Sequence, residues 1–294
     1  MEWSIDFITE REFKNHVAKT IEAYGDKLKS YDLKKLNSNL IDPVKMIFDK
    51  NIYNESWEEL IKSEIFRQRD KASNNDIGYF HQRIFHYFKG CHVPGNGTEG
   101  GWDVIYEKPE GIELKEGDTV HRIYVEMKNK HNTMNSAAAG KTYIKMQDQL
   151  LNDDDCACYL VEAIAKKSQD ITWTTTVDRR KVYHKRIRRV SIDQFYAQVT
   201  GEENAFYQIC MALPEAIQEV ISGAEDDIDV PDDIAFDELK ALADKMGNEN
   251  EELSTAMALY FLGFSTYLGF RKEYGYTLKN AYEYIKGART GRCL

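Results

Sequence analysis

Apolar residues recur every three to four positions through the first part of the chain, a spacing typical of helices with one buried face. One such run begins at Phe13, and a second covers residues 57–65. The interval contains no alternating stretch that favours a strand. Residues 1–74 are therefore predicted to form a helical N-terminal segment.

A third apolar run with helical spacing covers residues 77–88 and ends at Gly90. Asn and Asp side chains at 74–76 precede this run, and such residues favour the N-cap position of a helix. Glycine is in turn a common stop signal after the last helical residue. The pattern predicts a separate amphipathic helix over 77–88, followed by a glycine-rich loop over 94–101.

The pattern then changes to short apolar or alternating runs, which favour strands, around one further helix. The residues at 178–180 separate two extended runs and predict a hairpin between them. The predicted elements are strands 102–106 and 122–128, a helix over 135–151, a strand over 157–165, and strands 171–177 and 181–192.

Helical spacing returns from Ala205 onward, so the strands are confined to the middle of the chain. This order predicts an α/β protein with a central mixed sheet flanked by helices and with helical N- and C-terminal extensions. We expect the core at 75–215, and an acidic linker with C-terminal helices packed on that core at 216–294. No internal repeat is present, which argues against a solenoid.

One stretch raises the question of a membrane segment, because residues 253–270 contain no charge. Its Ser and Thr residues make it too polar for a favourable span, so a buried or interface helix is the better interpretation. The first residues show no basic segment followed by an apolar run, so no secretory signal is expected. Five cysteines without CxxC spacing fit reduced thiols, and the expected location is the cytoplasm.

Charge is distributed unevenly over the 294 residues, whose formal net charge is -10. Residues 128–190 carry 13 Lys/Arg against 7 Asp/Glu, whereas residues 215–252 carry 2 against 14. The net acidity therefore does not exclude a nucleic-acid partner, because a local basic surface can bind phosphates. The acidic stretch is interpreted most simply as a solvated loop.

The residues that indicate chemistry are Asp103, on one predicted strand, and Glu126-Met127-Lys128 on the next. Side chains alternate along a strand, so Glu126 and Lys128 share a face while Met127 points to the other. Pairing the two strands brings two carboxylates and one ammonium together. Two carboxylates and the main-chain carbonyl of Met127 are hard oxygen ligands that suit Mg²⁺.

This arrangement predicts hydrolysis of a phosphodiester, in which the metal stabilises the developing charge and Lys128 positions or deprotonates the attacking water. An Asp followed at a distance by Glu-x-Lys also occurs by chance, and surface charges on strands are the simpler interpretation of the bare pattern. The position on two strands within a basic region favours the nuclease interpretation.

Three longer stretches resemble one family of type II restriction endonucleases in the Asp…Glu-x-Lys, or PD-(D/E)XK, nuclease superfamily. They are YVEMKNKHNTMN at 124–135, IRRVSIDQFYAQVTG at 187–201 and AFYQICMALP at 205–214. Members of that family cut GGNCC or GGWCC sites. The resemblance covers 75–215 well and the C-terminal helices more weakly. It implies that Asp103 and Glu126 bind Mg²⁺ and that Lys128 acts on the water.

Two positions depart from the superfamily pattern. Trp102 stands where proline often precedes the aspartate, a position that varies widely. Some superfamily members also carry a Glu on the first core helix, where this chain has Gln82, so no third acid is assigned.

Basic and amide side chains near this strand are candidates for DNA contact, because such donors bind phosphates and base edges. An ordinary polar loop, a solvated helix face and ion pairing within the protein are the competing interpretations. The candidates are Lys130, His131, Asn132 and Asn135 after the strand, Lys141 and Lys145 on the next helix, and Lys185, Arg186, Arg188 and Arg189 on the last strand.

The sequence thus predicts a Mg²⁺-dependent type II restriction endonuclease that cuts double-stranded DNA. A near-palindromic site is read most simply by a homodimer, and the family resemblance implies a cognate DNA methyltransferase as functional partner. No membrane association is expected. A repair-type or structure-specific nuclease of the same superfamily and a non-catalytic DNA-binding module remain as alternatives.

Overall fold

The computed structural model describes residues 3–25, 29–95, 97–223, 232–245 and 251–264. Contacts group the chain into two compact units, each built from two separate stretches of sequence. Unit 1 comprises residues 1–24 and 74–227, and unit 2 comprises residues 25–73 and 228–294. Residues 224–231 and 246–250 of the acidic stretch, and residues 265–270 of the uncharged stretch, lie outside the described residues.

Unit 1 contains a six-stranded sheet with the strand order β1-β2-β3-β4-β6-β5. The pairs β3–β4 and β4–β6 are parallel, and the other neighbouring pairs are antiparallel. The α/β class and the central mixed sheet expected from the sequence are therefore confirmed. The strands are β1 (Cys91–His92), β2 (Val104–Glu113), β3 (Thr119–Lys130), β4 (Cys156–Ile164), β5 (Asp170–Val177) and β6 (Arg180–Ser191).

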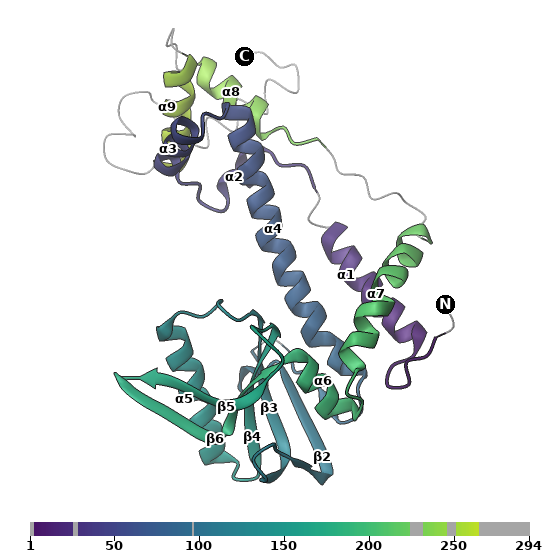
Figure 1. Cartoon of the computed structure of the whole chain (residues 1–294). Helices are drawn as coiled ribbons and strands as arrows, with labels where there is room; N and C mark the ends of the chain where they lie inside the picture. Colours follow the sequence, from purple (N-terminus) through teal and green to yellow (C-terminus); the bar gives the residue numbers. More distant parts are fainter. Residues whose placement is uncertain (1–2, 26–28, 96, 224–231, 246–250, 265–294) are drawn as a thin grey trace. The chain divides into compact units, whose positions relative to one another are not determined.

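The helices of unit 1 cover both faces of this sheet, as Figure 1 shows for α5 and α6. Alternate residues of β4 point to opposite sides, so Tyr159 packs in the larger core and Leu160 in the smaller core beneath α5. Complete burial of both faces explains the continuous apolar run at this position. The helices are α1 (Glu10–Gly25), α5 (Ser136–Asn152), α6 (Ile192–Thr200) and α7 (Ala205–Ser222), with short 3-10 turns η1 (Ile84–Tyr87) and η2 (Glu99–Gly101).

The crossover from β3 to β4 runs through α5, whose N-cap is Asn135. The Asn135 side-chain oxygen accepts a hydrogen bond of 2.9 Å from the amide of Ala138. At the other end of the sheet, Asp178 and Arg179 both have positive φ, as a two-residue hairpin turn requires. The predicted helix over 135–151 and the predicted hairpin are thus confirmed.

Helix α4 (Trp57–Arg83) corrects one prediction, because it runs without interruption through the expected N-cap at 74–76. No proline interrupts the helical spacing there, and Asn74 and Asn75 are exposed, so their side chains cost the helix little. The main-chain oxygen of Asn74 also accepts a hydrogen bond of 2.7 Å from the side chain of Asn129 on β3. Residues 77–83 are therefore the end of a long helix, not a helix of their own.

Unit 2 is helical and has its own apolar core, which includes Leu36, Ile61 and Leu259. Arg69 on α4 forms an ion pair of 2.7 Å with Asp233. Within the described parts of the chain, no helix is long and apolar enough to cross a membrane. The other helices of unit 2 are α2 (Leu33–Asn37), α3 (Pro43–Tyr53), α8 (Ala235–Asp244) and α9 (Glu251–Phe264).

Candidate active site

Asp103 lies between the glycine-rich loop and β2, where two hydrogen bonds to β3 fix its position. Its amide donates to the main-chain oxygen of Val125 at 2.9 Å. Its carboxylate Oδ2 accepts from the amide of Met127 at 2.6 Å. The side chain of Asp103 is therefore held against the middle of the Glu-x-Lys segment.

Glu126 and Lys128 project from the same face of β3, and Lys128 Nζ donates to Glu126 Oε1 at 2.7 Å. Met127 points to the opposite face, where its side chain is buried in the larger core. The period of two in a strand thus separates the buried residue from the two charged ones. The structure brings together Asp103, Glu126 and Lys128 as the sequence predicts.

Lys145, on α5, is a second ammonium at this site, although the sequence suggested it only as a DNA contact. Its Nζ donates to Glu126 Oε2 at 2.9 Å and to the main-chain oxygen of Gly101 at 2.7 Å. The same ammonium lies 4.0 Å from the centroid of the Trp102 ring. Glu126 is therefore bracketed by two lysines, one on each of its carboxylate oxygens.

The two carboxylates respond differently to this environment. Burial raises the pKa of Asp103, the hydrogen bond from Met127 opposes this, and the negative charge of Glu126 raises the pKa further. Burial also acts to raise the pKa of Glu126, but the hydrogen bonds and charges of Lys128 and Lys145 outweigh it and lower that pKa. Glu126 is thus held as a carboxylate, while Asp103 lacks a comparable cation.

The chemistry of these donors fits a hard divalent cation. Among the described residues, no group of three or more His, Cys, Asp or Glu side chains gathers to hold a metal. Mg²⁺ does not need such a cage, because it keeps several waters and is commonly bound by one or two carboxylates. The raised pKa of Asp103 reflects a carboxylate whose charge is poorly compensated, and a cation beside Glu126 relieves that cost.

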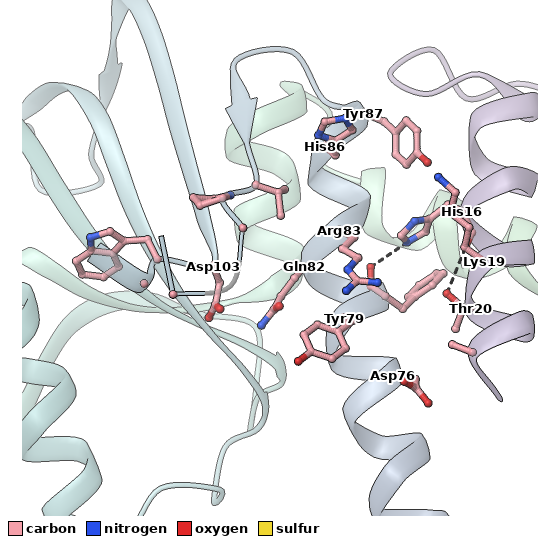
Figure 2. A pocket seen from close by; sticks show the side chains of 18 residues that line it. His16, Lys19, Thr20, Asp76, Tyr79, Gln82, Arg83, His86, Tyr87 and Asp103 are labelled. Carbon is pink, nitrogen blue, oxygen red and sulfur yellow. Dashed lines mark hydrogen bonds between the residues drawn. The ribbon is translucent and has the colours of Figure 1, made fainter. Parts of the chain in front are cut away.

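Asp103 also forms part of the wall of a cavity of about 490 Å³ in unit 1. Figure 2 shows Gln82, on α4, pointing into the same space as Asp103. Gln82 supplies an uncharged amide to this space. Trp102, also named from the sequence, lines this cavity too. The lining residues of α1 gave no signal in the sequence beyond their helical spacing.

The candidates that follow β3 lie in different environments. Lys130 and Asn132 are exposed. His131 Nδ1 lies 3.0 Å from the buried carboxylate of Glu162. Asn135 uses its side-chain oxygen to cap α5, and Lys141 is exposed on that helix. Of these five, Lys130, Asn132 and Lys141 are exposed and, unlike Asn135, make no side-chain hydrogen bond with the described residues.

The basic run on β6 is largely neutralised by carboxylates. Lys185 and Arg186 both pair with Asp118, at 3.0 and 2.7 Å. The side chain of Arg188 is only 1% exposed and pairs with Asp170 at 2.5 Å. Arg189 Nε donates to Glu162 at 3.0 Å, and this arginine also contacts His131. Internal ion pairing therefore accounts for the density of positive charge here, and Arg188 offers no surface to DNA.

The mixed sheet, with Asp103 just before β2, Glu126 and Lys128 on β3 and a helical crossover, has the arrangement that the resemblance to Asp…Glu-x-Lys nucleases predicts. The sequence profile of the Eco47II restriction endonuclease family matches residues 5–222. The chain therefore belongs to the Eco47II restriction endonuclease family.

Two curated proteins are similar over most of their length. The type II restriction enzyme Sau96I of Staphylococcus aureus is 28% identical over 225 residues, which cover 74% of this chain and 81% of the relative. The type II restriction enzyme Eco47II of Escherichia coli is 28% identical over 245 residues, which cover 79% of this chain and 95% of the relative. The expectation of a type II restriction endonuclease is thereby confirmed.

Proposed function

We propose that this type II restriction endonuclease uses Mg²⁺ to hydrolyse both strands of DNA at a GGNCC- or GGWCC-type site, leaving 5′-phosphate and 3′-hydroxyl ends. The observation that carries the proposal is the joining of Asp103 to the Glu-x-Lys strand by the 2.6 Å hydrogen bond from Met127. The site sequence follows from the resemblance of residues 124–135, 187–201 and 205–214 to a family that cuts such sites.

In this proposal, Asp103 and Glu126, with the main-chain carbonyl of Met127, hold the metal. A bound Mg²⁺ supplies positive charge that stabilises the phosphate in the transition state. Lys128 lies 2.7 Å from Glu126, so its ammonium is positioned to orient the attacking water. Once it has given up its own proton, the neutral amine would help to remove a proton from that water. The water oxygen bonds to phosphorus as the bond to the 3′ oxygen breaks.

The proposed assembly is a homodimer on a near-palindromic site, with each subunit cutting one strand. Among the candidate DNA contacts, the exposed Lys130, Asn132 and Lys141 are the best placed to reach phosphates or base edges. A cognate methyltransferase that modifies the same site protects the host DNA, and both proteins then act in the cytoplasm.

Single-turnover cleavage of a short duplex containing GGACC tests the catalytic roles. Wild-type protein is expected to cut with Mg²⁺ and not in EDTA, whereas Lys128→Ala is expected to lose about 100-fold or more in rate. Lys108→Ala is the matched control, because Lys108 is exposed on β2 and belongs to no candidate site. Equal cutting by wild type and Lys128→Ala contradicts the proposal.

A further inference from the structure

The cavity beside Asp103 has two helical walls and one wall formed by a loop. Four residues of α1 line it at helical spacing, from His16 to Ala23, and the facing residues of α4 and η1 run from Asp76 to Tyr87. The third wall is the loop at 93–103 that ends at Asp103. A volume of about 490 Å³ falls in the range of sites for small ligands, so a nucleotide-sized group fits.

Two basic side chains of this cavity form no ion pair with the described residues, although the carboxylates of Asp76 and Asp103 also line it. Lys19 on α1 and Arg83 on α4 line it, and neither forms an ion pair with any residue that the structure describes. The Arg83 guanidinium carbon lies 4.6 Å from the centroid of the Tyr79 ring, which orients the side chain without neutralising it. Arg186, Arg188 and Arg189, by contrast, each form an ion pair with a carboxylate.

The other titratable groups of the cavity include Asp76, Asp103 and His16. Asp76 is buried and has interactions of its own. His16 is buried, and its Nε2 lies 2.9 Å from the main-chain oxygen of Phe80. Burial lowers the pKa of His16 to about 4, so the ring is neutral at physiological pH. Within the described part of the chain, the cavity therefore holds two cations that form no ion pair. Arg83 lies next to Gln82, and Lys19 lies on the α1 wall across the cavity from Asp103 (Figure 2).

We propose that this cavity binds the sugar–phosphate backbone of the DNA strand that is cut, next to the scissile phosphate, with Lys19 and Arg83 as the phosphate contacts. The inference rests on the proposed function, because it takes Asp103 as the position of the reacting phosphate. Gln82 lies between Asp103 and Arg83 along the helix face and adds an uncharged donor to the same strand. A DNA strand carries a phosphate at every nucleotide. The phosphates next to the reacting one can therefore lie in the cavity while the reacting phosphate is at Asp103.

The test measures duplex binding in EDTA, so that no cleavage intervenes, at several salt concentrations. Lys19→Gln and Arg83→Gln are each expected to weaken binding about tenfold. The slope of log affinity against log salt is expected to become shallower by about 0.9 for each phosphate that the variant no longer neutralises. Arg11→Gln on α1 and Lys89→Gln after η1 are the controls, because both residues are exposed and neither lines the cavity.

A second measurement identifies the contacted phosphate. A set of duplexes is made in which one phosphate at a time, across a GGACC site, is replaced by a neutral methylphosphonate. The affinity of wild type and of Arg83→Gln for each duplex is measured. If Arg83 contacts a phosphate, at least one neutral linkage weakens wild type by about tenfold and leaves Arg83→Gln unaffected. Arg83→Lys, which keeps the charge, is expected to regain most of the salt slope.

Unchanged salt slopes and identical methylphosphonate profiles overturn the inference, even if wild type cuts DNA with Mg²⁺. If inorganic phosphate binds the protein but neither variant changes duplex binding, the inference is overturned as well. Failure of the proposed function appears separately, as an absence of Mg²⁺-dependent cutting by wild type. Circular dichroism of each variant verifies that it is folded before binding is compared.

Discussion

Lys145 joins α5 to the catalytic strand through Glu126. Its ammonium lies 2.9 Å from Glu126 Oε2. No motif around Lys145 in the sequence indicates this contact. Lys145 follows Glu126 by 19 residues, and from the sequence a helical lysine at that distance is interpreted as solvent-exposed. The two side chains meet only because the crossover helix α5 packs over the sheet. The alternation of Glu126 and Lys128 was predictable from a period of two, whereas the contacts of Lys145 depend on tertiary packing.

Removing Lys145 should make the site easier to load with metal. A cation that binds Glu126 must compete with the Lys145 ammonium, so Lys145→Gln is expected to bind Mg²⁺ about two- to fivefold more tightly, as loss of up to about 1 kcal/mol of ion pairing implies. Isothermal titration without DNA measures this directly, and Lys141→Gln, exposed one turn earlier on α5, is the control. Weaker binding in Lys145→Gln would show that the ammonium supports the metal site instead.

Arg188 should matter for stability and not for DNA. Its side chain and that of Asp170 are 1% and 3% exposed, so Arg188→Met leaves a buried carboxylate without its main partner. The free energy of unfolding is expected to fall by about 3–5 kcal/mol. Urea unfolding followed by circular dichroism measures the change, with Lys181→Met, exposed on the same strand, as control. A decrease within about 0.5 kcal/mol, the usual range for surface substitutions, would contradict the buried pair.

The same pair shows why basic runs mislead at the residue scale. The alternating pattern of β6 was sufficient to predict a strand, but it says nothing about the carboxylates that face each arginine. Asp118, Asp170 and Glu162 lie on other elements, and only the sheet order brings them against β6. The sequence thus shows how many positive charges β6 carries, but it does not show which of them are free of ion pairs and able to contact DNA.

At the scale of elements, α1 and α4 meet through a buried histidine. His16 on α1 lies 2.9 Å from the main-chain oxygen of Phe80 on α4, and the two rings pack at 4.6 Å. His81 is also held neutral, because burial lowers its pKa to about 4. The imidazole rings of His16 and His81 therefore stay neutral in the folded protein at a pH at which the unfolded chain protonates them.

This predicts a loss of stability in acid. An unfolded histidine takes up a proton as the pH falls through about 6.5, but folded His16 does so only near 4. Its contribution is complete above pH 6.5 and is lost between 6.5 and 4, which amounts to roughly 3 kcal/mol. His16→Gln should flatten the pH dependence of the unfolding free energy in this window. An unchanged slope in His16→Gln would contradict the account.

Most elements were predictable because their periodicities are local. The crossover helix, the hairpin and most strands lie within a few residues of their predicted positions, but β2 extends to Glu113, seven residues beyond the end predicted at 106. The continuous α4 was missed because Asn74, Asn75 and Asp76 are good capping residues in isolation, and the prediction gave this signal too much weight. The short strand β1 was missed because two residues carry no periodicity and pair only when β2 lies beside them.

At the scale of the whole molecule, the chain forms two units from interleaved segments. A sequence pattern marks consecutive segments, such as those expected at 1–74, 75–215 and 216–294. It does not reveal that residues 1–24 group with 74–227, because that grouping depends on apolar contacts between α1 and distant elements. The profile of the family, which begins at residue 5, includes both parts of the described unit 1.

The proposed homodimer makes a prediction about mixed subunits. A dimer of one wild-type and one Asp103→Asn subunit has a single competent site, so it should nick one strand of a plasmid at the target sequence. Differently tagged subunits allow such dimers to be purified, and open-circular plasmid is the expected product. Wild-type dimers carried through the same tags are the control and should yield linear DNA. Linear product from mixed dimers would contradict one subunit per strand.

The central claim is that one Mg²⁺-dependent site in this chain cuts both strands at a fixed sequence. The most direct test is digestion of unmethylated phage DNA by wild type and by Glu126→Gln, followed by sequencing of all fragment ends. The account predicts 5′-phosphate ends at GGNCC or at GGWCC and nowhere else, none of which appear with Glu126→Gln. Ends at unrelated sequences, or ends that persist in Glu126→Gln, would contradict it.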